Sequence, residues 1–560
     1  MAAPADSQHL TIRAPLDTDW PWRLFTLLAC AITAHLLLSP LGFNPTDDGF
    51  VLAQSRRILS GEVPHRDFIS VRPAGSGYIH VLDLLLGGEH TFLVSRLIYW
   101  LEIAIVCWCW LEIVIARSRL RPGHFGAAPL AVVAFMLSTH TFPAMAWHTV
   151  DGILLASLGF LLAGRGGRIS GLLGYALIGA AAICKQNFLP LLPLAVILLG
   201  DAWRLGAWAA ALSVPALYGV GLVAVGAARD MRLQLAAMTG LREGGLERYV
   251  STPWFAAGVV AGALIHTLLR FTRPRSTGPL GALPWLAPAA MGLLIAIAAR
   301  RMNANGFQFI DTDVLLLLGA TIGALLTSLG RGRAAVDRRA ATFVAALGLC
   351  SAISRGYQTP AHVAGPLAIV LALGVPGLFD PPSRPQAMRA GFACAVAVLL
   401  FVGPRWWSGR RDHLVHELTA PSLTRDLSGV LPGGAGIRTD ENTFALLQDL
   451  RETVDRQRGS RYAIIVDVPG WWACARQRNP LPTDWPQAIE LPTEALQMRF
   501  SASVIAQRAD LAVLVQRSYV VRAAEGFVPL DMNNPYYGAA IWVTRTLQRE
   551  SETRYWGVYR

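Results

Sequence analysis

Long hydrophobic stretches recur between residues 24 and 403, and short polar segments separate them. An α-helix needs about 20 apolar residues to cross the ~30 Å hydrocarbon core of a bilayer, and most of these stretches are close to that length. Because lipid offers the backbone no hydrogen-bond partner, each stretch is expected to be a helix. The pattern predicts about thirteen spans, at residues 24–41, 92–116, 126–142, 152–163, 170–184, 188–200, 206–227, 254–271, 282–299, 313–330, 340–353, 363–379 and 389–403.

The segment 170–200 admits two interpretations. A 15-residue helix rises only about 22 Å, so the two halves of this segment could form one span or two. The polar sequence Lys185-Gln186-Asn187 interrupts the apolar run, which favours two spans. A single span would invert every later loop.

The distribution of arginine predicts the orientation. Loops rich in basic residues face the cytoplasm, and less basic loops alternate with them. This places residues 1–23 inside and the C-terminus in the periplasm of a bacterial inner membrane. The loops assigned to the cytoplasm contain Arg117 to Arg121, Arg165 and Arg168, Arg204, Arg270 to Arg275, Arg331 to Arg339, and Arg384.

The pattern changes after the last predicted span. Residues 444–456 have the spacing of an amphipathic helix, and 462–468, 509–516 and 539–544 have the composition of strands. The predicted fold is therefore an α-helical polytopic membrane domain, residues 24–404 with a long periplasmic loop at 42–91, followed by a soluble α/β domain at 405–560.

Composition agrees with this organisation. Of the 560 residues, 53% are hydrophobic and 15% charged, which excludes an ordinary water-soluble protein. The net charge of +12 comes from basic residues scattered beside predicted spans, so membrane topology explains it better than nucleic-acid binding does.

The loop 42–91 is longer than a connection requires, and long ordered loops usually have a function. It begins with two adjacent carboxylates, Asp47 and Asp48. Such a pair can act as a general base or bind a cation, because desolvation and like-charge repulsion raise a carboxyl pKa. Alternatively, the pair caps a helix predicted over residues 51–59.

The order of these features resembles the GT-C glycosyltransferases, which include protein O-mannosyltransferases and the lipid A aminoarabinose transferase. The sequence departs from that pattern in two places, with Asp48 where many members carry Glu and Arg72 where lysine is common. The shared features are a first span followed by Asp47-Asp48, a short helix ending in Leu59-Ser60-Gly61 with Pro64, the pair Arg72-Pro73, a body of many spans, and an outside C-terminal domain.

The resemblance implies an enzyme that takes a sugar from a polyprenyl-phosphate donor. Asp47 would remove the proton from an acceptor hydroxyl, Asp48 would orient it or bind the acceptor, and Arg72 would neutralise the departing phosphate. A fixed cation is worth several kcal/mol where negative charge develops in a poorly solvated site.

Five further residues complete the candidate binding site. Asp151 begins a predicted span, as a second acidic site or as a helix cap. Lys185 would bind a phosphate. Alternatively, it only interacts favourably with the dipole at the C-terminus of the preceding helix. Arg355 and His362 lie on an outside turn where a basic group would reach the donor, although a snorkelling arginine fits equally well. Arg66, in the first loop, is a further candidate for substrate binding.

The predicted function is inverting transfer of a sugar from a polyprenyl-phosphate donor to a lipid, glycan or protein acceptor in the periplasm. The alternative is a transporter or flippase of a polar or lipid-linked solute, which would use the same intramembrane charges as a pathway. A scaffold that binds a partner through its outside domain would leave the long first loop unexplained. The sequence indicates no cofactor and leaves open whether a divalent cation assists.

Overall fold

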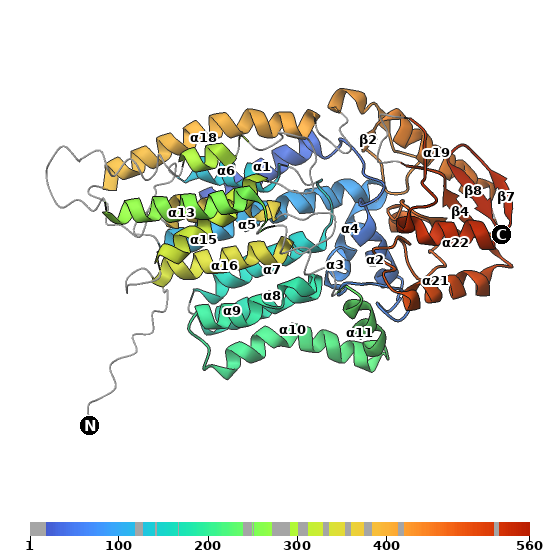
Figure 1. Ribbon diagram of the computed structural model, residues 1–560, viewed down its shortest axis with the longest axis horizontal. Helices are drawn as coiled ribbons and strands as arrows, with labels where there is room; N and C mark the ends of the chain where they lie inside the picture. Colours follow the sequence, from blue (N-terminus) through green and yellow to red (C-terminus); the bar gives the residue numbers. More distant parts are fainter. Residues whose placement is uncertain are drawn as a thin grey trace.

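The computed structural model forms an elongated helical body with a smaller domain at one end, which contains the C-terminus (Figure 1). The chain enters the body from the opposite end. The structure describes residues 18–117, 127–140, 143–165, 167–238, 249, 251–271, 292–298, 300, 312–328, 335–352, 360–374, 384–412, 419–457, 459–519 and 526–560.

The helices of the body lie roughly along its long axis (Figure 1). Those visible in that view are α1 (Trp20–Leu38), α5 (Thr91–Arg117), α6 (Ala128–Ser138), α7 (His148–Ala163), α8 (Arg168–Cys184), α9 (Leu191–Leu198), α10 (Leu205–Ala224), α13 (Pro253–Phe271), α15 (Thr312–Ser328), α16 (Ala335–Ala352) and α18 (Arg384–Asp412). The short helix α17 (Ala364–Ile369) packs among them, and α11 (Ala228–Ala236) follows α10.

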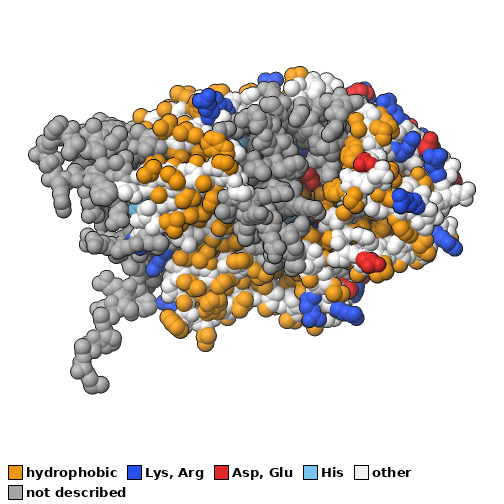
Figure 2. Space-filling model, viewed as in Figure 1, with side chains coloured by type: hydrophobic (Ala, Val, Ile, Leu, Met, Phe, Trp, Pro, Cys, Tyr) orange, Lys and Arg blue, Asp and Glu red, His pale blue; other side chains and the backbone are white. Residues whose placement is uncertain are grey.

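Several of these helices have the character of membrane spans. Within the described residues, four are long and apolar enough to cross a bilayer, and seven shorter apolar helices accompany them. Large aliphatic side chains such as Leu36, Leu217 and Leu400 are exposed on this body. Hydrophobic side chains cover much of its visible surface, whereas charged ones gather on the C-terminal domain (Figure 2). The fold is therefore that of a helical membrane protein with a small C-terminal sheet region.

Helices occupy the predicted hydrophobic stretches as far as the chain is described. Residues 170–200 form two helices, because Lys185 adopts an extended conformation (φ −153°, ψ 125°) between α8 and α9. Of the predicted span 282–299, residues 292–298 are described and helical. Much of the basic loops used for orientation lies outside the described residues.

Helices α13 and α15 pack with their backbones in direct contact. A Cβ atom added to Gly262 would lie 2.0 Å from the carbonyl oxygen of Ala320, and one added to Gly323 would lie 2.0 Å from that of Val259. Gly258 and Gly319 are equally restricted. Small residues at a four-residue spacing allow this close approach, which compensates for the absence of a hydrophobic driving force in lipid.

The segment between α1 and α5 forms three short helices, α2 (Phe50–Leu59), α3 (Gly75–Ile79) and α4 (Val81–Gly87), at the end of the body that carries the C-terminal domain (Figure 1). The predicted helix over 51–59 is confirmed as α2. Its N-cap is Gly49, with a positive φ of 88° and no side-chain cap. Gly49 is required there, because a Cβ would lie 2.4 Å from the Cα of Gly470.

The C-terminal domain is built around a four-stranded mixed sheet with the order β3-β4-β8-β7. Strands β3 and β4 are parallel, with Ile464 opposite Leu514, and the other pairs are antiparallel. The strands are β3 (Arg461–Ile465), β4 (Leu511–Gln516), β7 (Arg549–Glu552) and β8 (Trp556–Tyr559). Two further pairs are β1 (Arg425–Asp426) with β2 (Arg438–Thr439) and β5 (Ser518–Tyr519) with β6 (Val528–Pro529). The helices are α19 (Glu441–Arg456), α20 (Trp471–Cys474), α21 (Glu494–Gln507) and α22 (Gly538–Thr546).

Three of the four elements predicted for this domain are confirmed. Residues 444–456 lie in α19, and the strands predicted at 462–468 and 509–516 are β3 and β4. The strand predicted at 539–544 is wrong, because these residues form α22. Ala540 and Val543, three positions apart, are buried on one face of that helix. A short apolar run does not distinguish such a helix from a strand.

Candidate functional site

The two adjacent aspartates of the first loop have different environments. Asp48 is buried and accepts a hydrogen bond from the Arg96 side chain at 2.9 Å and another from the backbone N–H of Asn44 at 3.0 Å. Arg96 also donates to the carbonyl of Gly42 at 2.7 Å. Asp48 therefore fixes the loop to α5, and its carboxylate does not cap α2.

Asp47 is only half-buried and accepts a hydrogen bond from the Asn44 amide at 2.9 Å. It lies within electrostatic range of two residues of the C-terminal domain, Asp467 and Tyr536. Asp467 follows β3 and accepts a hydrogen bond from the Trp485 indole at 3.2 Å. Burial, and then the charge of Asp47, raise the pKa of Asp467 to about 7.

Tyr536 lies beside this pair of carboxylates. Burial raises the pKa of its phenol above the ordinary value, and the charges of Asp467, Asp47 and Glu490 add to the effect. Three acidic groups from two parts of the chain therefore lie within electrostatic range of one hydroxyl group. Asp47 has the most exposed of the three carboxylates, and thus the one that a hydroxyl-bearing molecule can reach.

Cationic groups converge next to this acidic region. Arg72 is buried and donates to Glu490 at 2.6 Å, and Lys185 donates to the Thr149 hydroxyl at 3.0 Å. Lys185 lies within electrostatic range of Arg72, and the charges of both interact with the imidazole of His148. The buried Nε2 atom of His148 has no hydrogen-bond partner among the described residues.

Aromatic rings pack alongside the contact between the acidic region and the cationic one. The guanidinium of Arg72 lies 5.6 Å from the ring centroid of Phe50. Phe50 in turn packs against Trp485 at 5.1 Å and Trp147 at 6.5 Å. Trp147 lies against His148, with ring centroids 4.6 Å apart. Phe50, the first residue of α2, thus packs between Arg72 of the cationic region and Trp485, the partner of Asp467 in the acidic region.

The other predicted site residues lie in different positions. His362 is buried within electrostatic range of Lys185 and Arg410, so it lies beside the cationic region as a polar group. Arg66 is exposed and paired with Asp67 at 2.8 Å, which sets it apart from the buried groups. Arg355 lies outside the described residues.

Asp151 belongs to a separate buried network. Its carboxylate accepts from Nε2 of His80 at 3.1 Å, and Nδ1 of His80 donates to Asp83 at 2.9 Å. Glu102 shares a hydrogen bond with Asp151. To donate to a carboxylate at each nitrogen, the imidazole of His80 must be protonated on both nitrogens. Otherwise one of the two carboxyl groups must be protonated. Because Asp151 is enclosed, its position favours neither substrate contact nor the simple cap.

The described residues contain no group of three or more His, Cys, Asp or Glu side chains that could hold a metal ion. Neither a family model nor a curated protein matches the chain.

The sequence interpretation missed the residues that the C-terminal domain contributes, which are Asp467, Trp485, Glu490 and Tyr536. One signal was available for Asp467, because it comes just after a buried strand, and ligands in α/β folds bind at the carboxyl ends of strands. The others lie in turns or, for Tyr536, in a short 3-10 helix, without a distinctive sequence pattern, and only tertiary packing brings them to this region.

Proposed function

We propose that the protein is an inverting glycosyltransferase of the GT-C type, which moves a sugar from a polyprenyl-phosphate donor to an acceptor hydroxyl. The observation that carries the proposal is the convergence of Arg72, His148 and Lys185. These residues are far apart in the sequence, yet they are buried within electrostatic range of one another, and Arg72 packs on Phe50, three residues after Asp47.

The cationic group suits the phosphate of the donor. Buried charges are costly, so they are usually paired or used for function. Within the described residues, Arg72 has an acidic partner in Glu490, whereas Lys185 has none. A phosphate would give Lys185 a counter-ion and the unpartnered Nε2 of His148 an acceptor. The donor's lipid tail would lie against the exposed aliphatic side chains of the helical body.

The chemistry assigns a role to each side of the site. The acceptor oxygen attacks the anomeric carbon and gives its proton to the carboxylate of Asp47, while the bond from that carbon to the phosphate oxygen breaks. Arg72 and Lys185 neutralise the charge on the departing polyprenyl phosphate. Asp467 and Tyr536 position the acceptor next to Asp47, and Asp48 holds Asp47 in place through the loop.

The proposal includes the topology. All thirteen predicted stretches would cross the membrane, and the basic loops would face the cytoplasm of a bacterial cell. The site and the C-terminal domain would then lie on the periplasmic side, where a lipid, glycan or protein would serve as acceptor.

Asp47→Asn tests the proposal. In cells that carry the wild-type gene, the variant or no gene, envelope glycans and glycolipids are compared by mass spectrometry, with membrane levels of the protein measured in parallel. We expect the variant to lose sugar transfer by a factor on the order of 10²–10⁴, the usual contribution of a general base.

Glu89→Gln is the matched control, because Glu89 is an exposed carboxylate of the same loop, and it should leave transfer unchanged. A correctly folded Asp47→Asn protein with unchanged products would contradict the proposal. Altered solute uptake by that protein would then favour a transporter.

A further inference from the structure

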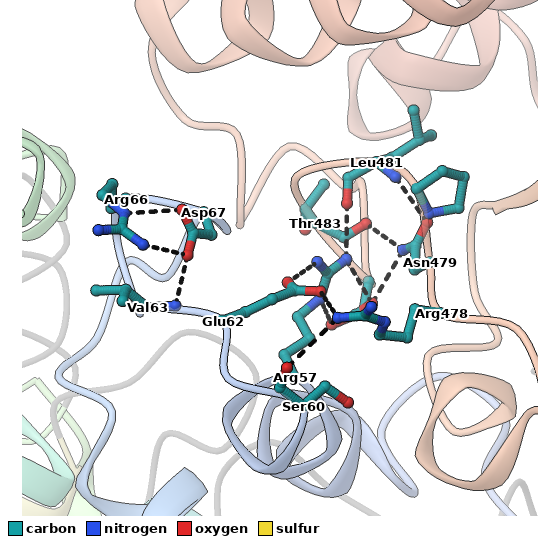
Figure 3. Close-up of polar contacts among 12 residues, drawn as sticks. Arg57, Ser60, Glu62, Val63, Arg66, Asp67, Arg478, Asn479, Leu481 and Thr483 are labelled. Carbon is teal, nitrogen blue, oxygen red and sulfur yellow. Dashed lines mark hydrogen bonds and ion pairs between the residues drawn. The ribbon is translucent and has the colours of Figure 1, made fainter.

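A second site lies where the first loop meets the C-terminal domain. A cavity of about 320 Å³ opens between the segment 57–67 and residues 478–482, close to the start of β3. This is about the lower limit of small-molecule sites in proteins. Its lining is mainly polar and comes from two parts of the chain about 400 positions apart (Figure 3).

The floor of the cavity is a fixed hydrogen-bond network. Arg57 donates to both carboxylate oxygens of Asp484, at 2.7 and 2.9 Å, to Glu62 at 2.7 Å and to the carbonyl of Leu481 at 2.6 Å. Asn479 donates to Asp484 at 2.9 Å and to the carbonyl of Thr483 at 2.8 Å (Figure 3). These groups hydrogen-bond mainly to one another, so they hold the shape of the cavity. A ligand would bind chiefly to other residues of the lining.

Two arginines at the cavity have unused donors. Arg478 donates only a long hydrogen bond of 3.4 Å to the carbonyl of Ser60 and lies 3.9 Å from Glu62. Arg461 is exposed, and its guanidinium has no hydrogen bond or ion pair within the described part of the chain. Each guanidinium carries five N–H donors in a planar fork that matches a carboxylate or a phosphate.

Acceptors lie on the same cavity. Glu62 and Asp67 are partly exposed, at 19% and 33% of their side-chain surface. Two hydrogen bonds from Arg66 hold Asp67 in a fixed orientation. Each carboxylate offers about four acceptor positions, so both can accept hydroxyl hydrogens beyond their present bonds.

We propose that this cavity binds a sugar-sized anion, a sugar acid or a sugar phosphate, with its oxyanion on Arg461 and Arg478 and its hydroxyl groups on Glu62 and Asp67. Two guanidinium groups with unused donors favour an anion over a neutral ligand, and the adjacent carboxylates favour one that also carries hydroxyl donors. The proposal does not require the transferase activity, because binding alone tests it.

Isothermal titration calorimetry on the full-length protein in detergent tests the site with four probes: glucuronate, glucose 6-phosphate, glucose and inorganic phosphate. We expect glucuronate or glucose 6-phosphate to bind at least tenfold more tightly than glucose and inorganic phosphate. The tighter of the two distinguishes a sugar acid from a sugar phosphate.

The variant Arg461→Gln/Arg478→Gln should weaken that binding at least tenfold, whereas Arg508→Gln, at an exposed arginine that does not line the cavity, should not. Both altered side chains are exposed, so folding should be retained, and circular dichroism checks it. The proposal is overturned if no probe binds at 50 mM, if glucose or inorganic phosphate equals the sugar anions, or if the double variant binds as the wild type does.

Discussion

At the scale of single residues, burial decides what a carboxylate can do. Asp47 and Asp48 are neighbours in the chain, yet Asp48 is enclosed with Arg96 while Asp47 faces the C-terminal domain. Asp467 is buried and has no cationic partner within the described residues, and its carboxylate accepts a hydrogen bond from the Trp485 indole. Its charged form is therefore disfavoured. Burial raises the pKa of Asp48 as well, and the charge of Arg96 offsets that effect only in part.

Asp467→Asn should make the protein more stable, in a pH-dependent manner. The native pKa of Asp467 is raised to about 7 from the ordinary value of 3.8, so its charged form destabilises the native state as pH rises through that interval. An amide keeps the acceptor for Trp485 and never ionises. The gain in melting temperature over the wild type should be near zero below pH 4, grow up to about pH 7 and stay constant above it.

Thermal unfolding followed by tryptophan fluorescence from pH 4 to pH 9 measures this difference. Asp510→Asn, at an exposed aspartate of the same domain, is the control and should show no such trend. A gain that does not change with pH would mean that Asp467 titrates at its ordinary pKa.

At the scale of elements, packing distance constrains residue choice more than helix propensity does. The glycines of α13 and α15 face backbone atoms, whereas Gly219 in α10 has no neighbouring atom within 4 Å of a built Cβ. Glycine costs a helix about 1 kcal/mol relative to alanine, so glycine on α13 and α15 must be compensated by close contact.

Gly262→Leu should separate α13 from α15. The new side chain would start 2.0 Å from the Ala320 carbonyl, so the helices must move apart, and overpacking of this kind typically costs about 1–3 kcal/mol. Melting temperature and the yield of monodisperse protein in detergent should both fall. Gly219→Leu, the same substitution in open space, should be neutral or slightly stabilising; equal losses in both variants would contradict the argument.

At the scale of the whole molecule, the C-terminal domain is attached to the first loop through both backbone and side chains. The N–H of Gly42 donates to the Arg438 carbonyl at 2.8 Å, and that of Ile69 donates to the Pro482 carbonyl at 2.6 Å. The ion pair of Arg57 with Asp484 and that of Arg72 with Glu490 join the same two regions. The two proposed sites lie along this junction, so domain attachment and site geometry depend on the same contacts.

Asp484→Ala should destabilise this junction by about 3–5 kcal/mol, because it leaves Arg57 buried with Glu62 as its remaining acidic partner. Chemical denaturation of the full-length protein measures the loss. Glu550→Ala, which removes the partner of Arg560 in an exposed pair, should change stability by at most about 1 kcal/mol. Similar effects of the two substitutions would show that the buried pair does not hold the junction.

Much of the architecture follows from the sequence alone. The hydrophobic stretches determine the helices, because lipid requires backbone hydrogen bonds to close within a segment. The polar sequence after Cys184 predicts the break at Lys185, and the change of periodicity predicts α19, β3 and β4. The strand predicted at 539–544 failed because a short apolar run carries no length signal, and its packing against the sheet decides its conformation.

The site required the tertiary structure. The sequence identified Asp47, Arg72, Lys185 and His362 as candidates, and the fold brings the last three within electrostatic range along one buried region. Only the tertiary structure shows that Asp151 belongs to the buried network with His80 and that Arg66 lies on the surface. Only the fold supplies Asp467 and Glu490, because contacts between residues some 420 positions apart leave no local pattern. Local periodicity determines an element, whereas burial and charge pairing, which determine chemistry, are properties of the packed chain.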